Sequence, residues 1–317
     1  MDIYFDRDYG KLYEKIEGGI VKTFEYDSKY GKIYHQFIER QIDEEYKDLI
    51  TPYGYGGPVI LKTIDREKML KEFEKIFCDY CVQNNIVSEF VRFHPLEDNA
   101  LDFLEMYNCE RIRSTLATDL SNCTDPFTEV FSKGCRKNIR QALNKGVCFK
   151  VIENPENIDS FINIYYETMG RNDAADYYYF DKEYFNSFLE KYRKETLLVE
   201  AIFEDKVIAA GFYFYRDGMV HIHLSGTLNE YLYLSPAYIL RYAVILWAKE
   251  HNCTIVHHGG GRTNSSEDSL FKFKKQFSNM ECGFYVGKKI WNEEVYNMLC
   301  KKNNAEDSMF FPKYRSR

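Results

Sequence analysis

Three lysines are interleaved with phenylalanines in the stretch DSLFKFKKQF, residues 268–277, shortly after a run of three glycines. As a helix, this segment gathers its apolar side chains on one face: Leu270, Phe273 and Phe277. Lys272 and Lys275 point away from that face and should be solvated, whereas Lys274 lies at its edge. A lysine at such an edge either extends to water or holds its ammonium group beside a substrate. If one of the three binds a negatively charged substrate, we expect it to be Lys274.

A second cluster of cations occupies the predicted helix in SKGCRKNIRQALNKG, with Ser132 as its N-cap and Gly146 as its stop. One arc of this helix is apolar and contains Cys135, Ile139, Ala142 and Leu143. Beside it runs a basic stripe that consists of Lys133, Arg136, Lys137 and Arg140. Three of these cations lie near the positive end of the helix dipole, where each costs about 0.3–1 kcal/mol unless an anion compensates it. The stripe is therefore a candidate phosphate-binding site, and a solvated amphipathic helix is the alternative.

Two histidines alternate in the predicted strand MVHIHLSG, so His221 and His223 share one face. Either is a candidate general base, and a hydrogen-bonded core histidine is the alternative. The next helix starts with Ser235 as N-cap and a proline at its first position, which leaves free backbone N–H groups at a natural anion site. Backbone amides near Ser225 and Gly226 are candidates to stabilise a tetrahedral oxyanion.

The chain as a whole is acidic, with a net charge of −7 over 317 residues. This disfavours non-specific coating of nucleic acid, so an anionic partner must meet a local basic patch. No catalytic Ser/His/Asp order, metal-ligand spacing or dinucleotide fingerprint occurs, and we expect neither a metal nor a permanently bound cofactor. A charged amino terminus and the lack of 18 consecutive apolar residues predict a cytoplasmic protein without stable membrane insertion.

The elements that position these residues fall into two halves of similar order. The first half reads as strands near 20–26, 32–39 and 59–63, a helix from Asp65 to Asn84, a strand at 86–93, a short helix near 98–107 and an extended run to Leu120. The second half reads as strands at 196–203, 207–215 and 219–226, a helix from Ser235 to His251, a strand at 253–258, the lysine-rich helix and a strand near 282–287. This repeated order suggests two duplicated α/β (α+β) domains.

Several segments of the sequence resemble a known family, the FemABX-type aminoacyltransferases. SKGCRKNIRQALNKGV is similar to the segment that links the two domains of that family, and HHGGGRTNSSEDSLFKFKKQFS is similar to its second domain, including the FK…F signature. TPYGYGGP, residues 51–58, resembles a loop of the soluble branch. The resemblance implies two GNAT-like domains, each a mixed, mostly antiparallel sheet flanked by helices. We expect the first domain at 1–125, a linker at 126–146, the second domain at 147–302 and a tail at 303–317.

The family transfers an amino acid from an ester on tRNA to an amine of a peptidoglycan precursor. The resemblance therefore implies an aminoacyltransferase whose partners are the acceptor end of charged tRNA and a nucleotide- or lipid-linked glycan or peptide precursor. Phe273 and Lys274 match the pair that meets the tRNA acceptor end, and Arg136 or Arg140 matches an arginine that contacts the precursor's phosphates. On the acceptor side we also place Lys137 and four residues of the first half: Tyr53, Tyr55, Arg92 and His94.

Several alternatives stay open. Where the family often has an Asp before a Pro, this chain has His94, which suggests a different acceptor. An acyl-CoA-dependent acyltransferase acting on an amino-sugar or peptide amine is the first alternative, although TLNEYLYLSPA lacks the glycines of a CoA loop. A non-catalytic GNAT-like binding protein is the second. The tail MFFPKYRSR permits contact with the inner face of the membrane, or packs back on a domain. The oligomeric state stays open.

Overall fold

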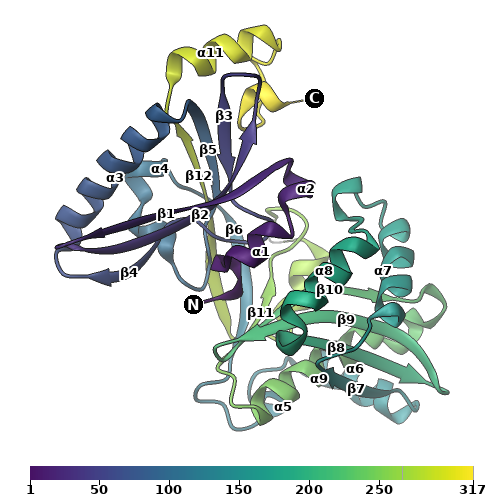
Figure 1. Ribbon diagram of the computed structural model, residues 1–317. Coiled ribbons are helices and arrows are strands. Elements are labelled where there is room, and N and C mark those ends of the chain that lie inside the picture. Colours follow the sequence, from purple (N-terminus) through teal and green to yellow (C-terminus); the bar gives the residue numbers. More distant parts are fainter. Residues whose placement is uncertain (266, 317) are drawn as a thin grey trace. The chain divides into compact units, whose positions relative to one another are not determined.

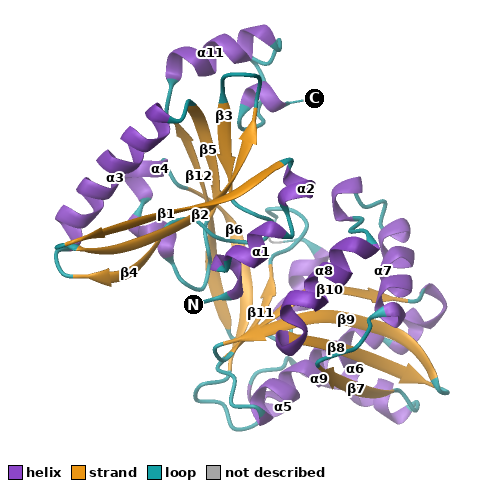
Figure 2. Cartoon of the chain, in the orientation of Figure 1, coloured by secondary structure: helices purple, strands orange, loops and turns teal. Residues whose placement is uncertain are grey.

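A computed structural model describes residues 1–265 and 267–316. The chain divides into two compact units (Figure 1). Unit 1 comprises Met1, residues 3–113 and residues 283–317, whereas unit 2 comprises Asp2 and residues 114–282. Figure 2 shows that both units combine strands with covering helices. Within the described residues, no helix has both the length and the apolar composition that crossing a bilayer requires.

In unit 1 the strand order is β1-β2-β3-β5-β12, and β4 pairs with β2. The strands are β1 Gly19–Ser28, β2 Gly31–Gln41, β3 Lys47–Ile50, β4 Val59–Thr63, β5 Ile86–Arg92 and β12 Met280–Ile290, of which residues 283–290 belong to this unit. The helices are α1 Arg7–Lys11, α2 Glu14–Glu17, α3 Arg66–Gln83, α4 Leu104–Tyr107 and α11 Glu293–Lys302. All pairs are antiparallel except β3 with β5. Met69, Phe73 and Phe77 repeat every four residues on α3, and this stripe is buried in the core of the unit.

In unit 2 the strand order is β6-β11-β10-β9-β8-β7. The strands are β6 Glu110–Asp119, of which residues 114–119 belong to this unit, β7 Cys148–Glu153, β8 Thr196–Phe203, β9 Lys206–Arg216, β10 Met219–Thr227 and β11 Ile255–Gly259. The helices are α5 Pro126–Glu129, α6 Lys133–Asn144, α7 Asp159–Arg171, α8 Lys182–Tyr192, α9 Pro236–Glu250 and α10 Ser269–Lys275. β10 and β11 are the parallel pair, and their pairing ends where His221 lies opposite His257.

The two faces of the unit 2 sheet carry different helices. In Figure 1, α7 and α8 lie on one face, and α9 with α6 lies on the other. Side chains alternate along β9 accordingly: Phe212 and Phe214 pack against Phe188 of α8, whereas Tyr213 belongs to the core cluster under α9. This alternation decides which predicted site residues can meet.

The predicted fold class is confirmed: both units are mixed, mostly antiparallel sheets flanked by helices. The elements expected from periodicity are present, with ends that differ by a few residues. The sequence pattern did not reveal β3, β7, the helices before residue 18, the pair α7 and α8, or α11. β3 and β7 are short, and neither shows a clean alternation of apolar and polar residues.

The division of the chain differs from the domain boundaries expected from the sequence. Residues 283–317 group with unit 1, because β12 pairs with β5 from Val286 to Ile290. α11 follows, and its buried side chains pack on Val87 of β5. The tail packs back as well, since Tyr314 is buried and Arg315 donates to the Asp48 carboxylate. A return of the chain to its first unit leaves no signal in local periodicity.

Candidate acyl-donor site in unit 2

Lys274 is held at one place by the loop that precedes its helix. Asp268 caps α10, because its Oδ1 accepts the backbone N–H of Phe271 at 2.8 Å. Its Oδ2 accepts the N–H groups of Arg262 and Thr263 at 3.0 and 2.9 Å, which folds the glycine-rich segment back onto the helix. The Nζ of Lys274 donates to the carbonyl of Gly260 at 2.6 Å. The ammonium group is thus positioned rather than free to sample solvent.

The other two lysines of α10 behave differently, as the helical spacing predicts. The side chain of Lys272 is 53% exposed and pairs with Glu267, and that of Lys275 is 63% exposed. Lys274 is only partly exposed. Its orientation agrees with the expectation, while its role in chemistry stays a prediction.

Phe273 connects α10 to α9. Its ring packs edge-on against Tyr238 and Phe277, with centroids 4.9 and 5.5 Å apart. On α9, the guanidinium of Arg241 lies 4.8 Å from the centroid of the same ring. Phe277 is fully buried and Phe273 is partly buried, so the helix presents a graded apolar face.

Gln276 joins the ends of three helices. Its side-chain amide donates to the hydroxyl of Tyr238 in the first turn of α9 at 3.1 Å. Its backbone carbonyl accepts the N–H of Ser132, the residue before α6, at 2.9 Å. The beginning of α6, the beginning of α9 and the end of α10 therefore meet in unit 2. Three groups of predicted site residues, at Arg136, Ser235 and Lys274, lie on these three helix ends.

The basic helix α6 starts and stops where expected. Ser132 Oγ accepts the Cys135 N–H at 3.1 Å, and Gly146 takes a φ of +93° after the last turn. Cys135, Ile139 and Ala142 of the apolar arc are buried, whereas Leu143 at its edge is 36% exposed.

The four cations of the stripe are not equivalent. Arg136 donates to the backbone carbonyls of Thr128 and Phe131, so its guanidinium is engaged in holding the segment before the helix. Arg140 lies over the ring of Phe127, 5.1 Å from its centroid, and is exposed. Lys133 and Lys137 are exposed and form no ion pair with any described residue. Lys137 and Arg140 are therefore better placed than Arg136 to bind a phosphate.

The start of α9 differs from the predicted cap. Ser235 occupies the N-cap position with a left-handed φ of 55°, but its side chain makes no capping hydrogen bond. Gly226 faces α7, where an added Cβ would lie 2.7 Å from the carbonyl oxygen of Ile164. A substrate has no room on that side of Gly226. Ser225 is only partly buried and pairs with Gly211 of β9.

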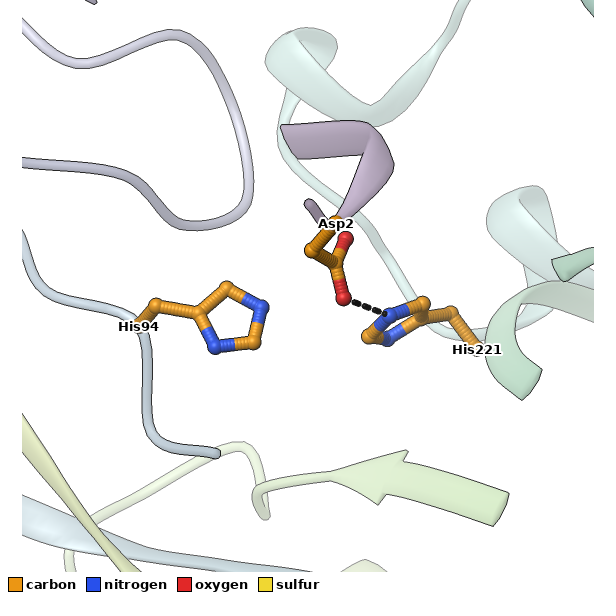
Figure 3. A group of neighbouring side chains, drawn as sticks. All are labelled: Asp2, His94 and His221. Carbon is orange, nitrogen blue, oxygen red and sulfur yellow. Dashed lines mark hydrogen bonds and ion pairs between the residues drawn. The ribbon is translucent and has the colours of Figure 1, made fainter. Parts of the chain in front are cut away.

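The two histidines of β10 lie on the α8 face of the sheet. Their rings are 5.3 and 5.1 Å from the ring of Phe214, which confirms that they share a face. Figure 3 shows His221, whose Nε2 donates to Asp2 Oδ2 at 2.7 Å. The carboxylate fixes this tautomer and orients the ring. Sequence reasoning did not find Asp2, because nothing at the amino terminus signals a partner for a distant strand.

His223 is a weak candidate for the general base. Its Nε2 lies 3.1 Å from the hydroxyl of Tyr184. Burial, and then the nearby His221, lower the pKa of His223 to about 3. The ring is neutral at physiological pH and binds protons poorly. The helix of Lys274 packs on the opposite face, since its Phe273 and the following Phe277 belong to the core cluster under α9. The structure therefore does not bring the two histidines of β10 to Lys274.

The four acceptor-side residues expected in the first half belong to unit 1 and support its loop 51–58. His94, also drawn in Figure 3, is buried, and its Nδ1 accepts the N–H groups of Leu96 and Glu97. Tyr55 packs edge-on against His94. Tyr53 stacks on Tyr13, and Arg92 donates to the carbonyl of Thr51. Each of the four residues makes contacts that stabilise the fold, and a role in binding the acceptor stays a prediction.

Asn99 holds the same loop in shape, and sequence reasoning missed it. Its side-chain amide donates to the carbonyls of Gly56 and Pro58, both at 2.9 Å, while its oxygen accepts the N–H of His94. Gly54 and Gly57 have positive φ values and contact Tyr4 and Phe93 closely, so only glycine fits at these turns. TPYGYGGP is therefore first of all a structural signature.

Two further residues near Lys274 escaped the sequence reasoning. Arg241 is an arginine within the otherwise apolar helix α9 and is only 3% exposed. His258 is 1% exposed and follows His257 at the end of β11. For Arg241, the sequence does carry a signal: a charged residue within an otherwise apolar helix. No local pattern separates the second from a core histidine.

Residues 131–274 match the family described as the acetyltransferase (GNAT) domain, a segment that lies entirely in unit 2. The chain is 24% identical to UDP-N-acetylmuramoylpentapeptide-lysine N(6)-alanyltransferase of Weissella viridescens, over 95% of this chain and 87% of that protein.

Two solved structures share the fold. The crystal structure of FemX superposes with a TM-score of 0.73, 12% identity and 94% of each chain covered. A tandem GNAT protein from the clavulanic acid biosynthesis pathway gives a TM-score of 0.54 at 7% identity, over 86% of this chain and 83% of that chain. The resemblance to the FemABX-type acyltransferases, expected from the sequence, is confirmed, and so is the GNAT fold.

Proposed function

We propose that this chain, which resembles the FemABX-type acyltransferases in sequence and fold, is an N-acyltransferase that transfers an aminoacyl group from aminoacyl-tRNA to an amine of a cell-wall or surface-glycan precursor. The observation that carries the proposal is the Phe273–Lys274 pair. It matches the family's signature and lies where three helix ends of unit 2 converge, with the ammonium group fixed on the Gly260 carbonyl.

The proposed reaction needs little from the protein beyond positioning and charge. The acceptor amine attacks the ester carbonyl, so a C–N bond forms and the carbonyl oxygen becomes an oxyanion. Collapse of this intermediate breaks the C–O bond to the tRNA ribose, and the proton lost by the amine ends on the ribose oxygen. Lys274 supplies positive charge beside the reacting ester, which stabilises the oxyanion or the leaving oxygen.

Proton transfer in this scheme does not require a histidine of β10. His223 has a pKa of about 3, and His221 is bound to Asp2 on the face of the sheet away from Lys274. The ribose oxygen is a stronger base than His223 once the C–O bond breaks. We therefore infer that the substrate carries its own proton and that no resident cofactor takes part.

The stripe on α6 is the proposed acceptor site. Lys137 and Arg140 are exposed cations in the second and third turns of a helix whose first turn has no acidic residue. A phosphate of a nucleotide- or lipid-linked precursor would pair with both side chains. Such precursors are made in the cytoplasm, so we place the protein there, with peripheral contact at the membrane's inner face where the precursor is lipid-linked.

The segment before α9 bears on the choice of donor. In enzymes that use CoA, glycines before this helix let backbone N–H groups surround a pyrophosphate. Here residues 229–234 form a 3₁₀-helix without glycine, and Ser235 follows in a left-handed conformation. This supports an ester on tRNA rather than a CoA thioester.

The proposal is tested with the purified protein, charged tRNA and a nucleotide-linked peptide precursor. Mass spectrometry of the precursor should show a mass increase of one amino-acid residue, and the amino acid should disappear from tRNA. An unmodified precursor with intact charged tRNA, across the bacterial aminoacyl-tRNAs, would refute the proposed function.

A further inference from the structure

Arg241 is a charged group enclosed in an apolar helix. It lies in the second turn of α9, is 3% exposed, and its Nε is fully buried without a hydrogen-bond partner. Among the described residues, no carboxylate forms an ion pair with it. A buried arginine normally has such a partner, because removing a cation from water is costly.

The neighbours of Arg241 do not neutralise it. Tyr213 and Cys135 are the two groups that could do so as anions, but burial raises the pKa of each to about 12. Both are therefore neutral at physiological pH. The ring of Phe273, 4.8 Å away, attracts the guanidinium but carries no net charge. Within residues 1–265 and 267–316, the positive charge has no counterion.

His258 identifies a second unsatisfied group in the same neighbourhood. Thr118 donates its single hydroxyl proton to the Phe277 carbonyl at 2.6 Å, so it must accept from His258 Nε2 at 2.8 Å. His258 is thereby the Nε2–H tautomer, and its buried Nδ1 has no partner. Burial, and then the cations Arg241 and Lys274, lower the pKa of His258. Two cations thus act on one enclosed polar region.

The hydrogen-bonded pairing of β10 with β11 ends next to His258. β10 and β11 pair only from Met219 to His221 with Ile255 to His257, and His258 is the next residue. Beyond it, the two strands are no longer hydrogen-bonded to each other. The end of the pairing between two parallel strands, beside a buried guanidinium without an ion-pair partner among the described residues, is a suitable environment for a small anionic group.

We propose that Arg241 is the anchor of an oxyanion-binding site behind Phe273, which takes a carboxylate or a phosphate group of a ligand. The guanidinium offers a planar set of donors that matches either group in a bidentate manner. A carboxylate would belong to an acidic side chain on the transferred amino acid. A phosphate would belong to the sugar–phosphate backbone of the donor.

The site is tested without any reaction, by anion binding to the full chain. Inorganic phosphate and glutarate are titrated separately at constant ionic strength against chloride, and thermal shift and calorimetry report binding. We expect at least one of the two anions to raise the Tm of the parent protein, and Arg241→Met to bind it at least tenfold more weakly. Arg241→Lys should retain part of the response.

Arg216→Met is the matched control. Arg216 also lies over an aromatic ring, 5.4 Å from the centroid of Tyr192, but it is paired with Glu195. Its loss should leave the anion response unchanged. If Arg241→Met does not fold, the buried Arg241 Nε–H signal of the parent protein provides the readout, because it exchanges slowly and should shift on anion addition in ¹⁵N spectra.

The outcomes separate the two sources and the proposal from its rivals. A response to phosphate alone assigns a phosphate ligand, and a response to glutarate alone assigns a carboxylate. Equal responses in the parent protein and Arg241→Met, or no response and no Nε–H shift in the parent protein, would overturn the site. Because no tRNA or turnover is involved, this failure is distinct from a failure of the proposed function.

Discussion

The two units treat buried charge in opposite ways. In unit 1, Asp48 is fully buried and accepts from both Arg40 and Arg315, and buried Glu89 pairs with His35 at 2.6 Å. In unit 2, Arg241 is as deeply buried as these groups but has no acidic partner among the described residues.

This difference separates charges that build a fold from charges that are available to a ligand. In unit 1, Asp48 joins β2 and the tail to β3, and the His35–Glu89 pair joins β2 to β5. These charges are used within the protein and stabilise its fold. The cation of unit 2 lowers stability unless something else binds it. Duplicated architecture has therefore been put to different use: the buried charges of unit 1 named above pair within the protein, whereas Arg241 of unit 2 has no ion-pair partner among the described residues.

The strongest test of this contrast compares Asp48→Asn with Arg241→Met. Removing the acid leaves two arginines around a buried position, so we expect unit 1 to lose about 3–5 kcal/mol of unfolding free energy. Removing Arg241 deletes a cation that has no ion-pair partner in the described part of the chain, so the free energy of unfolding should stay level or increase. Urea denaturation measures both. A larger loss for Arg241→Met than for Asp48→Asn would contradict the comparison.

Lys274→Ala should separate activity from stability. Loss of a positioned charge at a transition state typically lowers turnover by about 100- to 1000-fold. The hydrogen bond to the Gly260 carbonyl accounts for about 1 kcal/mol of stability or less. Single-turnover transfer and urea denaturation give the two numbers. Lys272→Ala, on the same helix but exposed, is the control, and normal turnover in Lys274→Ala with a large stability loss would make the lysine structural.

Acid should weaken unit 2 through its neutral histidines. The folded pKa of His223 is about 3, below the ordinary value near 6.5, so the unfolded chain binds the proton better. Stability is therefore present above pH 6.5 and is lost as the pH falls toward 3. From pH 7 to pH 5 this histidine should account for a loss of about 2 kcal/mol. His223→Gln should remove this part of the pH dependence of stability. If the pH dependence is unchanged in the variant, the prediction for His223 is wrong.

The smallest expected effect concerns the stripe on α6. Lys137→Ala combined with Arg140→Ala should weaken binding of a phosphate-bearing precursor by about tenfold at low salt. The remaining affinity should depend less on salt, because fewer exposed charges contribute. Calorimetric titrations at two salt concentrations measure this, with the exposed Lys150→Ala as control. Arg136 is left intact because it holds backbone carbonyls. Equal affinities would dismiss the stripe.

The sequence was informative where the physics is local. Helical spacing separated Lys274 from Lys272 and Lys275, and capping rules set both ends of α6. It could not tell that Gly226 is covered by α7, because that contact joins segments about 60 residues apart and α7 itself went unnoticed. The pairing of His221 with Asp2 spans 219 residues and is equally invisible. For Arg241 the sequence placed a charge in an apolar helix, and only the fold revealed that none of the described residues neutralises it.

One measurement tests the central claim, that unit 2 is built for an ester donor on tRNA, more directly than any variant. The protein is given charged tRNA and acyl-CoA together with an amine acceptor, and mass spectrometry follows which donor loses its acyl group. We predict that charged tRNA is consumed and acyl-CoA persists. Consumption of acyl-CoA with intact charged tRNA would contradict the account.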